Sequence, residues 1–141
     1  MFRAALFLLI LASPLLVAAQ VQRPTDPIRS SPAYAEILLR TTELKAELES
    51  ISDDYTDTSF RVMDLRLELD TLNKAASRIL AVRPSDSGKL TLALGKLLVR
   101  KAALDAELAR LARNYKPEHT DVKRTKKKAD VFESAIREIL P

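Results

Sequence analysis

The second half of the sequence repeats a pattern found 60 residues earlier. Under this shift, residues 44–48 (LKAEL) align with residues 104–108 (LDAEL), and Tyr55 aligns with Tyr115, without any gap. A chain that contains one unit twice is expected to form the same supersecondary element twice, because each copy carries the same hydrophobic pattern. The repeat therefore limits the fold to two similar elements that pack in tandem.

Each unit contains two segments in which apolar residues recur at alternating steps of three and four. In the first unit these positions are Ile37, Thr41, Leu44, Leu48, Ile51 and Tyr55, followed by Val62, Leu65, Leu69, Leu72, Ala76 and Ile79. Such steps average about 3.5 residues, the period of helices in coiled coils and antiparallel bundles. Glycine occurs only twice and tryptophan is absent, which is typical of long helices. We predict helices near 33–54, 59–82, 88–114 and 120–140.

Short polar segments separate these helices. Residues 56–59 and 116–119 form the expected turns, and residues 83–88 form the linker between the units. Short connections make neighbouring helices antiparallel. The predicted fold is therefore all-α, with two tandem antiparallel helical hairpins at 33–82 and 89–141, arranged as an up-down four-helix bundle or a coiled coil. The hairpins could also stay extended and bury their apolar residues against a second molecule, but one shared core buries more surface, so we favour the compact bundle.

The N-terminal segment resembles a secretory signal peptide. Residues 1–19 combine Arg3 with an apolar run and end in small residues, so we expect cleavage after Ala19 and a periplasmic or secreted location. The apolar run is short for a bilayer, which requires about 20 residues, although an uncleaved anchor is the alternative. Residues 20–32 contain three prolines and predict an extended tether.

The composition excludes most forms of catalysis. The sequence has no cysteine, and His119 is its only histidine. Metal sites and nucleophilic sites need several converging side chains, and phosphate-binding loops need more than two glycines. His119 at a helix entrance is more typical of a cap or an exposed residue. We therefore predict no catalytic residue, no cofactor and no metal ligand.

A run of basic residues is the sharpest local feature, and we call it the basic stripe. It comprises Lys123, Arg124, Lys126, Lys127 and Lys128. All five fall outside the apolar helical positions, so the simplest interpretation is a solvated helix face that pairs with neighbouring acidic residues. The alternative is a surface for an anionic polysaccharide or a membrane surface. A net charge of only +4 does not indicate nucleic-acid binding.

Four residues occupy special positions in the apolar pattern. Thr41 and Lys101 place polar groups at equivalent positions of the two units, where they fix register or lie near an open end of the bundle. We favour the open end. Tyr55 and Tyr115 occupy the last position of the apolar pattern before each turn, and we expect them to pack at the hairpin tips with their hydroxyls in water.

The second turn resembles part of a known family. Tyr115–Val122, followed by Lys123 and Arg124, is similar to the Tyr-x-x-x-His-Pro-Asp-Val segment of the polysaccharide chain-length determinant, or exopolysaccharide co-polymerase, family. Thr120 replaces the family's proline, and Ser59-Phe60 replaces the His-Pro pair in the first unit. The resemblance implies a periplasmic coiled-coil hairpin, and it includes neither the membrane helices nor the kinase domain of some members.

These observations predict a non-catalytic, exported scaffold or interaction protein of the bacterial cell envelope, with a link to polysaccharide export. Its partner would be an envelope protein or a second copy of the chain. The alternative is a small helical chaperone or carrier, which would need an exposed apolar patch. Residues beside the apolar seams could supply one: Leu38, Leu39, Leu67, Leu98 and Val99.

Overall fold

The computed structural model describes residues 26–141, so the signal-like residues 1–19 and the beginning of the expected tether lie outside it. In the described part the chain is all-α, as the sequence predicts. The elements are α1 (Pro32–Ile51), α2 (Phe60–Leu80), the short 3₁₀ helix η1 (Pro84–Lys89), α3 (Leu92–Ala112) and α4 (Thr120–Ile139). The helix ends agree with the predicted ends to within a few residues, and η1 lies in the predicted linker.

Side chains at the predicted breaks cap the helices. The Ser31, Ser59 and Thr91 hydroxyls accept hydrogen bonds from the backbone N–H groups three residues later, at 3.2–3.3 Å. Pro32 takes the first position of α1, where its missing N–H is not needed. The two hairpins begin 60 residues apart, at Pro32 and Leu92, and their second helices also begin 60 residues apart.

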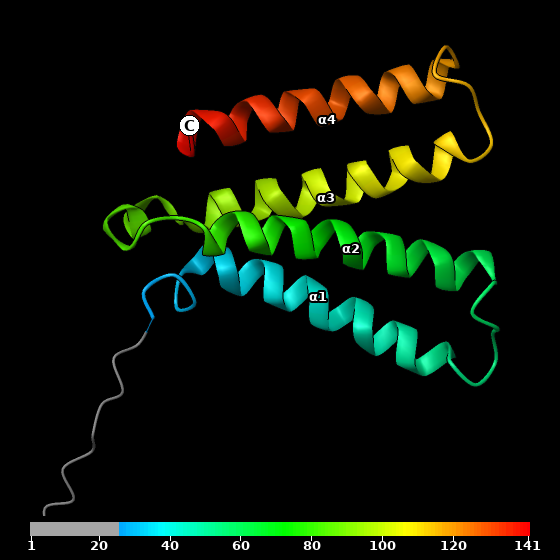
Figure 1. The fold of residues 1–141 in the computed structure, drawn as a ribbon, viewed down its shortest axis with the longest axis horizontal. Coiled ribbons are helices and arrows are strands. Elements are labelled where there is room, and N and C mark those ends of the chain that lie inside the picture. Colours follow the sequence, from blue (N-terminus) through cyan, green and yellow to red (C-terminus); the bar gives the residue numbers. More distant parts are fainter. Residues whose placement is uncertain (1–25) are drawn as a thin grey trace, which may run out of the picture.

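The four helices lie side by side in chain order, with both hairpin turns at one end of the molecule (Figure 1). Helix α3 is in contact with α1, α2 and α4, whereas the other main helix contact is between α1 and α2. The two hairpins therefore pack together in a compact bundle and do not stay extended. Helix α4 is attached mainly through α3 and forms one edge of the bundle.

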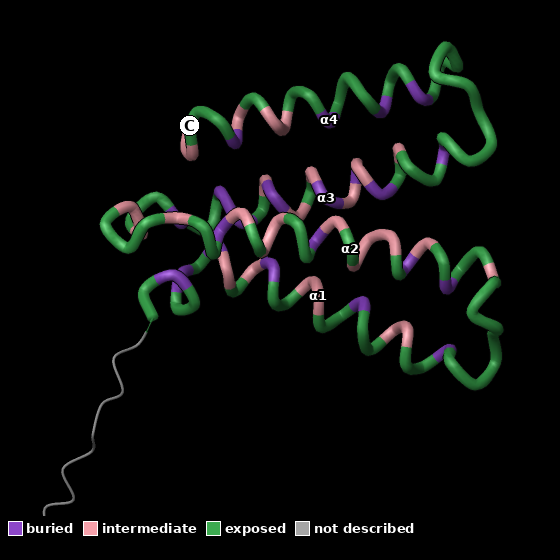
Figure 2. Tube along the Cα trace, viewed as in Figure 1, coloured by how far each residue is buried: buried purple, intermediate pink, exposed green. Residues whose placement is uncertain are grey.

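The core follows the predicted apolar positions. Figure 2 shows buried positions on the faces that the helices turn toward one another. The largest fully buried side chains are Ile37, Leu44, Leu72, Ile79, Leu90, Leu94 and Ile136. The recurring positions predicted for the first unit, from Ile37 to Ile79, are all buried or half-buried where they lie within α1 or α2. The period of 3.5 residues thus identifies the buried faces correctly.

Residues 26–31 form a turn, not the extended tether expected there. The Ile28 N–H donates to Asp26 Oδ1 at 2.9 Å, and the Ser31 hydroxyl donates to the Ile28 carbonyl oxygen at 2.7 Å. Ile28 is only 5% exposed and joins the core. Burial of this isoleucine stabilises the turn, an effect that the proline content of the segment does not reveal.

The contact between the hairpins depends on Gly95 in α3. A Cβ atom at this position would lie 2.8 Å from Ala33 Cα and 2.9 Å from Glu36 Cβ of α1. Nearby, the Ala33 N–H donates to the Leu90 carbonyl oxygen at 3.2 Å, so an otherwise unpaired N–H of α1 is satisfied by the second hairpin. Glycine is required at position 95 because the α1 backbone occupies the space of a side chain.

We predict that Gly95→Ala destabilises the fold. The added methyl group must push α1 away, which costs about 1–3 kcal/mol, while the better helix propensity of alanine recovers up to about 1 kcal/mol. Urea unfolding followed by circular dichroism should show a net loss of about 1–2 kcal/mol. Gly88→Ala is the matched control, because no heavy atom lies within 4 Å of its added Cβ. Equal stability of the two variants would contradict the close contact.

Candidate functional site

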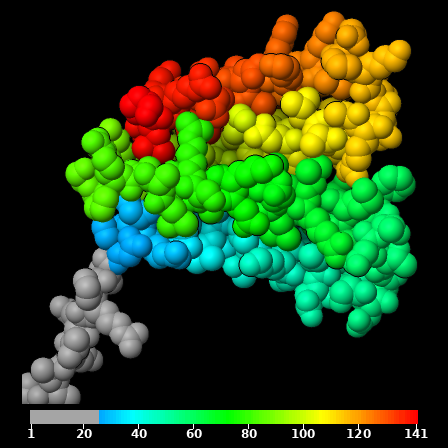
Figure 3. All heavy atoms as spheres, in the orientation of Figure 1, coloured from blue at the N-terminus to red at the C-terminus, as the bar shows by residue number. Residues whose placement is uncertain are grey.

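A groove runs between α2 and α4, with α3 as its floor. It contains a hollow of about 390 Å³, and the space-filling view shows α3 atoms between those of α2 and α4 (Figure 3). We call this the α2–α4 groove. Its lining residues are Leu67, Asp70, Thr71, Lys74, Ala75, Arg78, Leu98, Lys101, Ala102, Asp105, Ala109 and Glu133. Glu133 is the single α4 residue among them, so α4 stands away from α2 along most of the groove.

Helical spacing explains how the groove is lined. Lining residues recur at three- and four-residue steps on both helices. They include Leu67, Thr71, Lys74 and Arg78 on α2, and Leu98, Lys101, Asp105 and Ala109 on α3. Residues at these steps share one helix face. The groove therefore presents one continuous face of α2 and one of α3.

The groove continues toward the hairpin tips as a more apolar hollow. This second hollow of about 490 Å³ is lined by Met63, Arg66, Leu67, Ala109 and Arg113. It shares Leu67 and Ala109 with the first hollow. No residue of α4 lines it, so the groove is open at the tip end.

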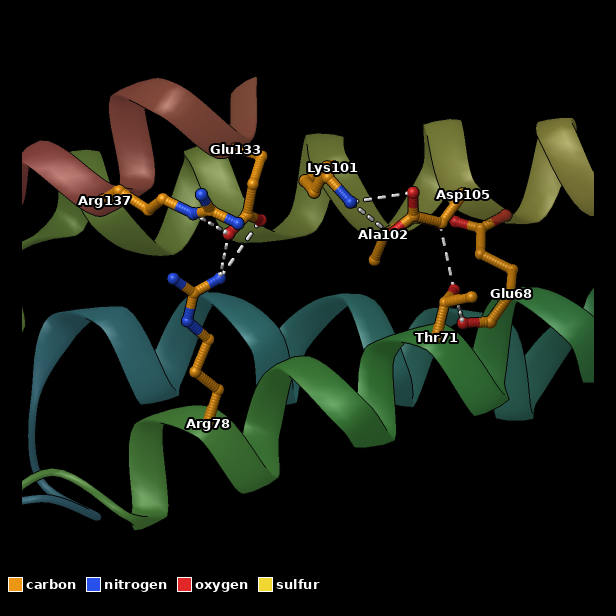
Figure 4. A network of polar contacts seen from close by, with 8 residues as sticks. All are labelled: Glu68, Thr71, Arg78, Lys101, Ala102, Asp105, Glu133 and Arg137. Carbon is orange, nitrogen blue, oxygen red and sulfur yellow. Dashed lines mark hydrogen bonds and ion pairs between the residues drawn. The ribbon is translucent and has the colours of Figure 1, made fainter. Parts of the chain in front are cut away.

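Polar side chains in the groove are bonded within the protein. The Lys101 ammonium lies 2.8 and 2.7 Å from the two carboxylate oxygens of Asp105, and Asp70 is 2.6 Å from the Lys74 ammonium. The Thr71 hydroxyl lies 3.0 Å from the Ala102 carbonyl oxygen and joins α2 to α3 (Figure 4). These pairs leave the charged groups accessible along the groove without leaving a buried polar atom unpaired in the described residues.

Arg78 and Glu133 close the groove at the end away from the tips. The Arg78 Nη1 atom lies 3.1 and 3.2 Å from the two carboxylate oxygens of Glu133, and Arg137 Nε lies 3.2 Å from the same carboxylate (Figure 4). Burial alone would raise the pKa of Glu133, but the charge of Arg78 and the hydrogen bonds from both arginines outweigh it and lower the pKa. In the described residues, this is the one ion pair that joins α4 to another helix.

Lys101 corrects one expectation from the sequence. Thr41 and Lys101 were expected near an open end of the bundle, but both lie in the middle of their helices and are half-buried. Lys101 lines the groove because α4 leaves the adjacent side of α3 open there. The bundle is thus open along its side, a feature that the hydrophobic pattern does not reveal.

We predict that Glu133→Gln lowers stability in a pH-dependent way. Since the folded-state pKa of Glu133 is lowered, its ionised form stabilises the fold above its ordinary pKa of 4.5 and loses that effect as the pH falls through the lowered value. Urea unfolding should show a loss of about 0.5–1 kcal/mol at pH 7 that shrinks below pH 4.5.

Glu138→Gln serves as the control for this experiment, because Glu138 is exposed on the same helix. The free energy of unfolding of the Glu138→Gln variant should equal that of the wild type across this pH range. We call the Arg78–Glu133 ion pair the Arg78–Glu133 clasp. If the loss of stability in Glu133→Gln persisted unchanged in acid, the clasp would not act through the charge of Glu133.

The basic stripe lies on exposed surface of α4, as its spacing predicts. Arg124 lies 3.7 Å from Asp121, and Lys126 lies 3.2 Å from Asp130, both within α4. Among the described residues, no carboxylate lies within ion-pair distance of Lys123, Lys127 or Lys128. The stripe therefore does not pair with a neighbouring helix in the described residues, and none of its five residues lines the α2–α4 groove.

Both tyrosines lie at the hairpin tips and are largely exposed, at 44% for Tyr55 and 45% for Tyr115. The Tyr115 ring stacks on the His119 ring, with centroids 4.2 Å apart. His119 Nδ1 also accepts a hydrogen bond from the Asp121 N–H at 3.3 Å, so the histidine caps α4. The structure places Tyr115, but not Tyr55, in an aromatic contact across its turn.

We predict that Tyr115→Ala destabilises the fold more than Tyr55→Ala. The first variant loses the stacked ring pair, worth about 0.5–1.5 kcal/mol, whereas no such pair involves Tyr55 in the described residues. Thermal unfolding followed by circular dichroism compares the two variants at equivalent positions. Equal melting temperatures would show that the stack does not hold the second tip.

In residues 26–141 no three or more side chains of the metal-binding types converge on one point. No helix of this part is long and apolar enough to cross a membrane. Comparison with family models, curated proteins and solved structures finds no match to the chain. The fold thus defines a helical bundle, and the resemblance to chain-length determinants rests on the sequence alone.

The sequence did not indicate the groove. The sequence pattern does not distinguish Arg78, Asp105 and Glu133, because each lies in an ordinary helical stretch and its partners in the groove from other helices are far away along the chain. A usable signal was present in Ala102 and Ala109, small residues that alternate with charged ones on α3.

The apolar patch expected for a chaperone is divided in the structure. Leu38 and Leu39 are exposed, Leu67 and Val99 are half-buried, and Leu98 is buried.

Proposed function

We propose that the chain is a non-catalytic helical interaction module that holds a partner protein in the α2–α4 groove. The observation that carries this proposal is the open side of the bundle, where α2 and α4 both pack on α3 but are joined by the Arg78–Glu133 clasp at one end. A concave, partly apolar groove bordered by charged groups is typical of surfaces that receive another protein segment.

The chemistry of the groove supports a binding role over a catalytic one. Asp70, Asp105 and Glu133 each lie within 2.6–3.1 Å of a basic side chain. At Glu133 the effect of burial is outweighed by the neighbouring arginines, which lower its pKa, whereas a general acid at neutral pH needs a carboxyl group with a raised pKa. These residues are suited to fix the orientation of a bound segment.

An exported location forms part of the proposal. It rests on the signal-like residues 1–19, which lie outside the described residues. A role in the cell envelope, near polysaccharide export, rests in addition on the resemblance at Tyr115–Val122. The chaperone alternative receives less support, because Leu98, one of the five residues expected in its patch, is only 3% exposed.

Site-specific photo-crosslinking in the producing cells tests this function. A photo-reactive amino acid at Ala109, which lines both hollows, should form a covalent adduct with one reproducible protein, identified by mass spectrometry. The same probe at Ser85, exposed in η1, is the matched control. Adding Leu67→Glu should reduce the Ala109 adduct about tenfold or more, since a charge then lies in the apolar part of the groove.

Two results would refute the groove as the binding site. One is the absence of any adduct at Ala109, and the other is the same set of adducts at Ala109 and Ser85. Circular dichroism of the Leu67→Glu variant shows whether the bundle is intact. If that variant loses helicity, the adducts of the Ala109 and Ser85 probes without Leu67→Glu decide the test.

A further inference from the structure

The two hairpins carry opposite net charges. Residues 33–82 contain six Lys and Arg against ten Asp and Glu, a net charge of −4, whereas residues 89–141 contain 13 against seven, a net charge of +6. Figure 1 shows α1 and α4 at opposite edges of the bundle. The outer helix of the acidic hairpin and the outer helix of the basic hairpin are therefore both free to meet other molecules.

The outer face of α4 is basic, with one exposed apolar side chain. Lys123, Lys127 and Lys128 lack a carboxylate partner among the described residues, as shown above. Val131 is 68% exposed, although α4 buries its other apolar residues, such as Val122 and Ile136. A basic helix face with a single apolar residue suits an acidic protein surface better than a membrane, which needs a broad apolar face.

The outer face of α1 has the complementary character. Leu38 and Leu39 are 53% and 57% exposed, and Glu43 and Glu49 are exposed on the same helix. Glu43 lies 3.1 Å from Arg40, but Arg40 is also held by Glu68 at 2.9 Å, so Glu43 can turn to another cation without leaving Arg40 unpaired. The face thus offers an apolar pair with two carboxylates on its tip side, and the exposed Lys45 lies between these carboxylates along the helix.

The two faces also match in register. Helix α1 runs toward the hairpin tips and α4 runs away from them (Figure 1), so α1 of one copy beside α4 of another, with tips at the same end, is antiparallel. Leu39 lies 12 residues before the end of α1, and Val131 lies 11 residues after the start of α4. Glu43 and Lys128 are each eight residues from these ends.

The match continues to the tips. Glu49 lies two residues before the end of α1, and Lys123 lies three residues after the start of α4. At 1.5 Å per residue these levels differ by only about 1.5 Å. An apolar contact and two carboxylate–ammonium contacts therefore fall at the same three heights on both faces.

We propose that the chain associates with further copies of itself head to tail, with α1 of one copy packed on the outer face of α4 of the next. The contact continues the order of antiparallel helices found within the bundle. Because it joins two different surfaces, it leaves an unused α1 at one end and an unused α4 at the other, and assembly proceeds to a ring or a filament. The contact lies outside the α2–α4 groove and does not depend on it.

Sedimentation velocity of the purified protein tests the association. In about 50 mM salt the mean mass should rise with protein concentration, and about 500 mM salt should raise the apparent dissociation constant at least tenfold, because screening weakens exposed charge pairs. A double reversal on α4, Lys123→Glu with Lys128→Glu, should have an effect of the same size at low salt. So should a double reversal on α1, Glu43→Lys with Glu49→Lys.

Mixing identifies the surfaces that pair. The α4 variant and the α1 variant should each be monomeric, but an equimolar mixture should assemble, because every α1–α4 contact in the mixture can again join unlike charges. The control is Lys96→Glu with Arg83→Glu, which makes the same change in net charge as the α4 variant at exposed side chains of α3 and the linker, outside both the groove and the two outer faces. This control should assemble like the wild type.

Three results would overturn the proposal: a monomer at all concentrations in low salt, association that both reversals leave unchanged, or a mixture that stays monomeric. If a reversal variant loses helicity by circular dichroism, the salt titration of the wild type decides. Each of these results leaves the crosslinking at Ala109 unaffected, so failure of self-association is distinguishable from failure of the groove.

Discussion

The close contact between α1 and α3 at Gly95 is the constraint on which the rest of the structure depends. With no side chain at position 95, the α3 backbone can approach Ala33, and the two hairpins share one core. Helix α3 thereby becomes the element that contacts α1, α2 and α4. A helix that already packs on two others has one remaining side for α4, and that side faces away from α1. The position of α4 at the edge of the bundle follows from this crowding.

The edge position of α4 has two consequences for function. On one side, α4 and α2 diverge, and the groove between them exposes parts of α2 and α3 that a closed bundle would bury. On the other side, α4 presents the basic stripe to solvent, at the edge opposite the outer face of α1. The Arg78–Glu133 clasp limits how far α4 can move, because it ties the end of α4 to α2. A single arrangement thus provides a groove for a partner and a surface for a second copy.

Much of the fold was predictable from the sequence, because helix positions and buried faces are local properties. The apolar steps from Ile37 to Ile79 located α1 and α2, and Ser31, Ser59 and Thr91 marked helix starts. The site was less predictable, because Arg78 and Glu133 are 55 residues apart and only the packing of α4 brings them together. Ile28 was missed for the same reason: its burial depends on distant residues. The opposite charges of the hairpins could have been counted in advance, but their meaning required the placement of α1 and α4 at opposite edges.

The open side of the bundle between α2 and α4 is the feature on which the proposed groove depends. Methyl NOESY spectra of the protein in solution test this arrangement most directly. We expect NOEs from α3 methyl groups to α1, to α2 and to α4, and none between Leu67 of α2 and Val122 or Ala129 of α4. NOEs between those α2 and α4 methyl groups would show a closed four-helix bundle without a groove and would contradict the account.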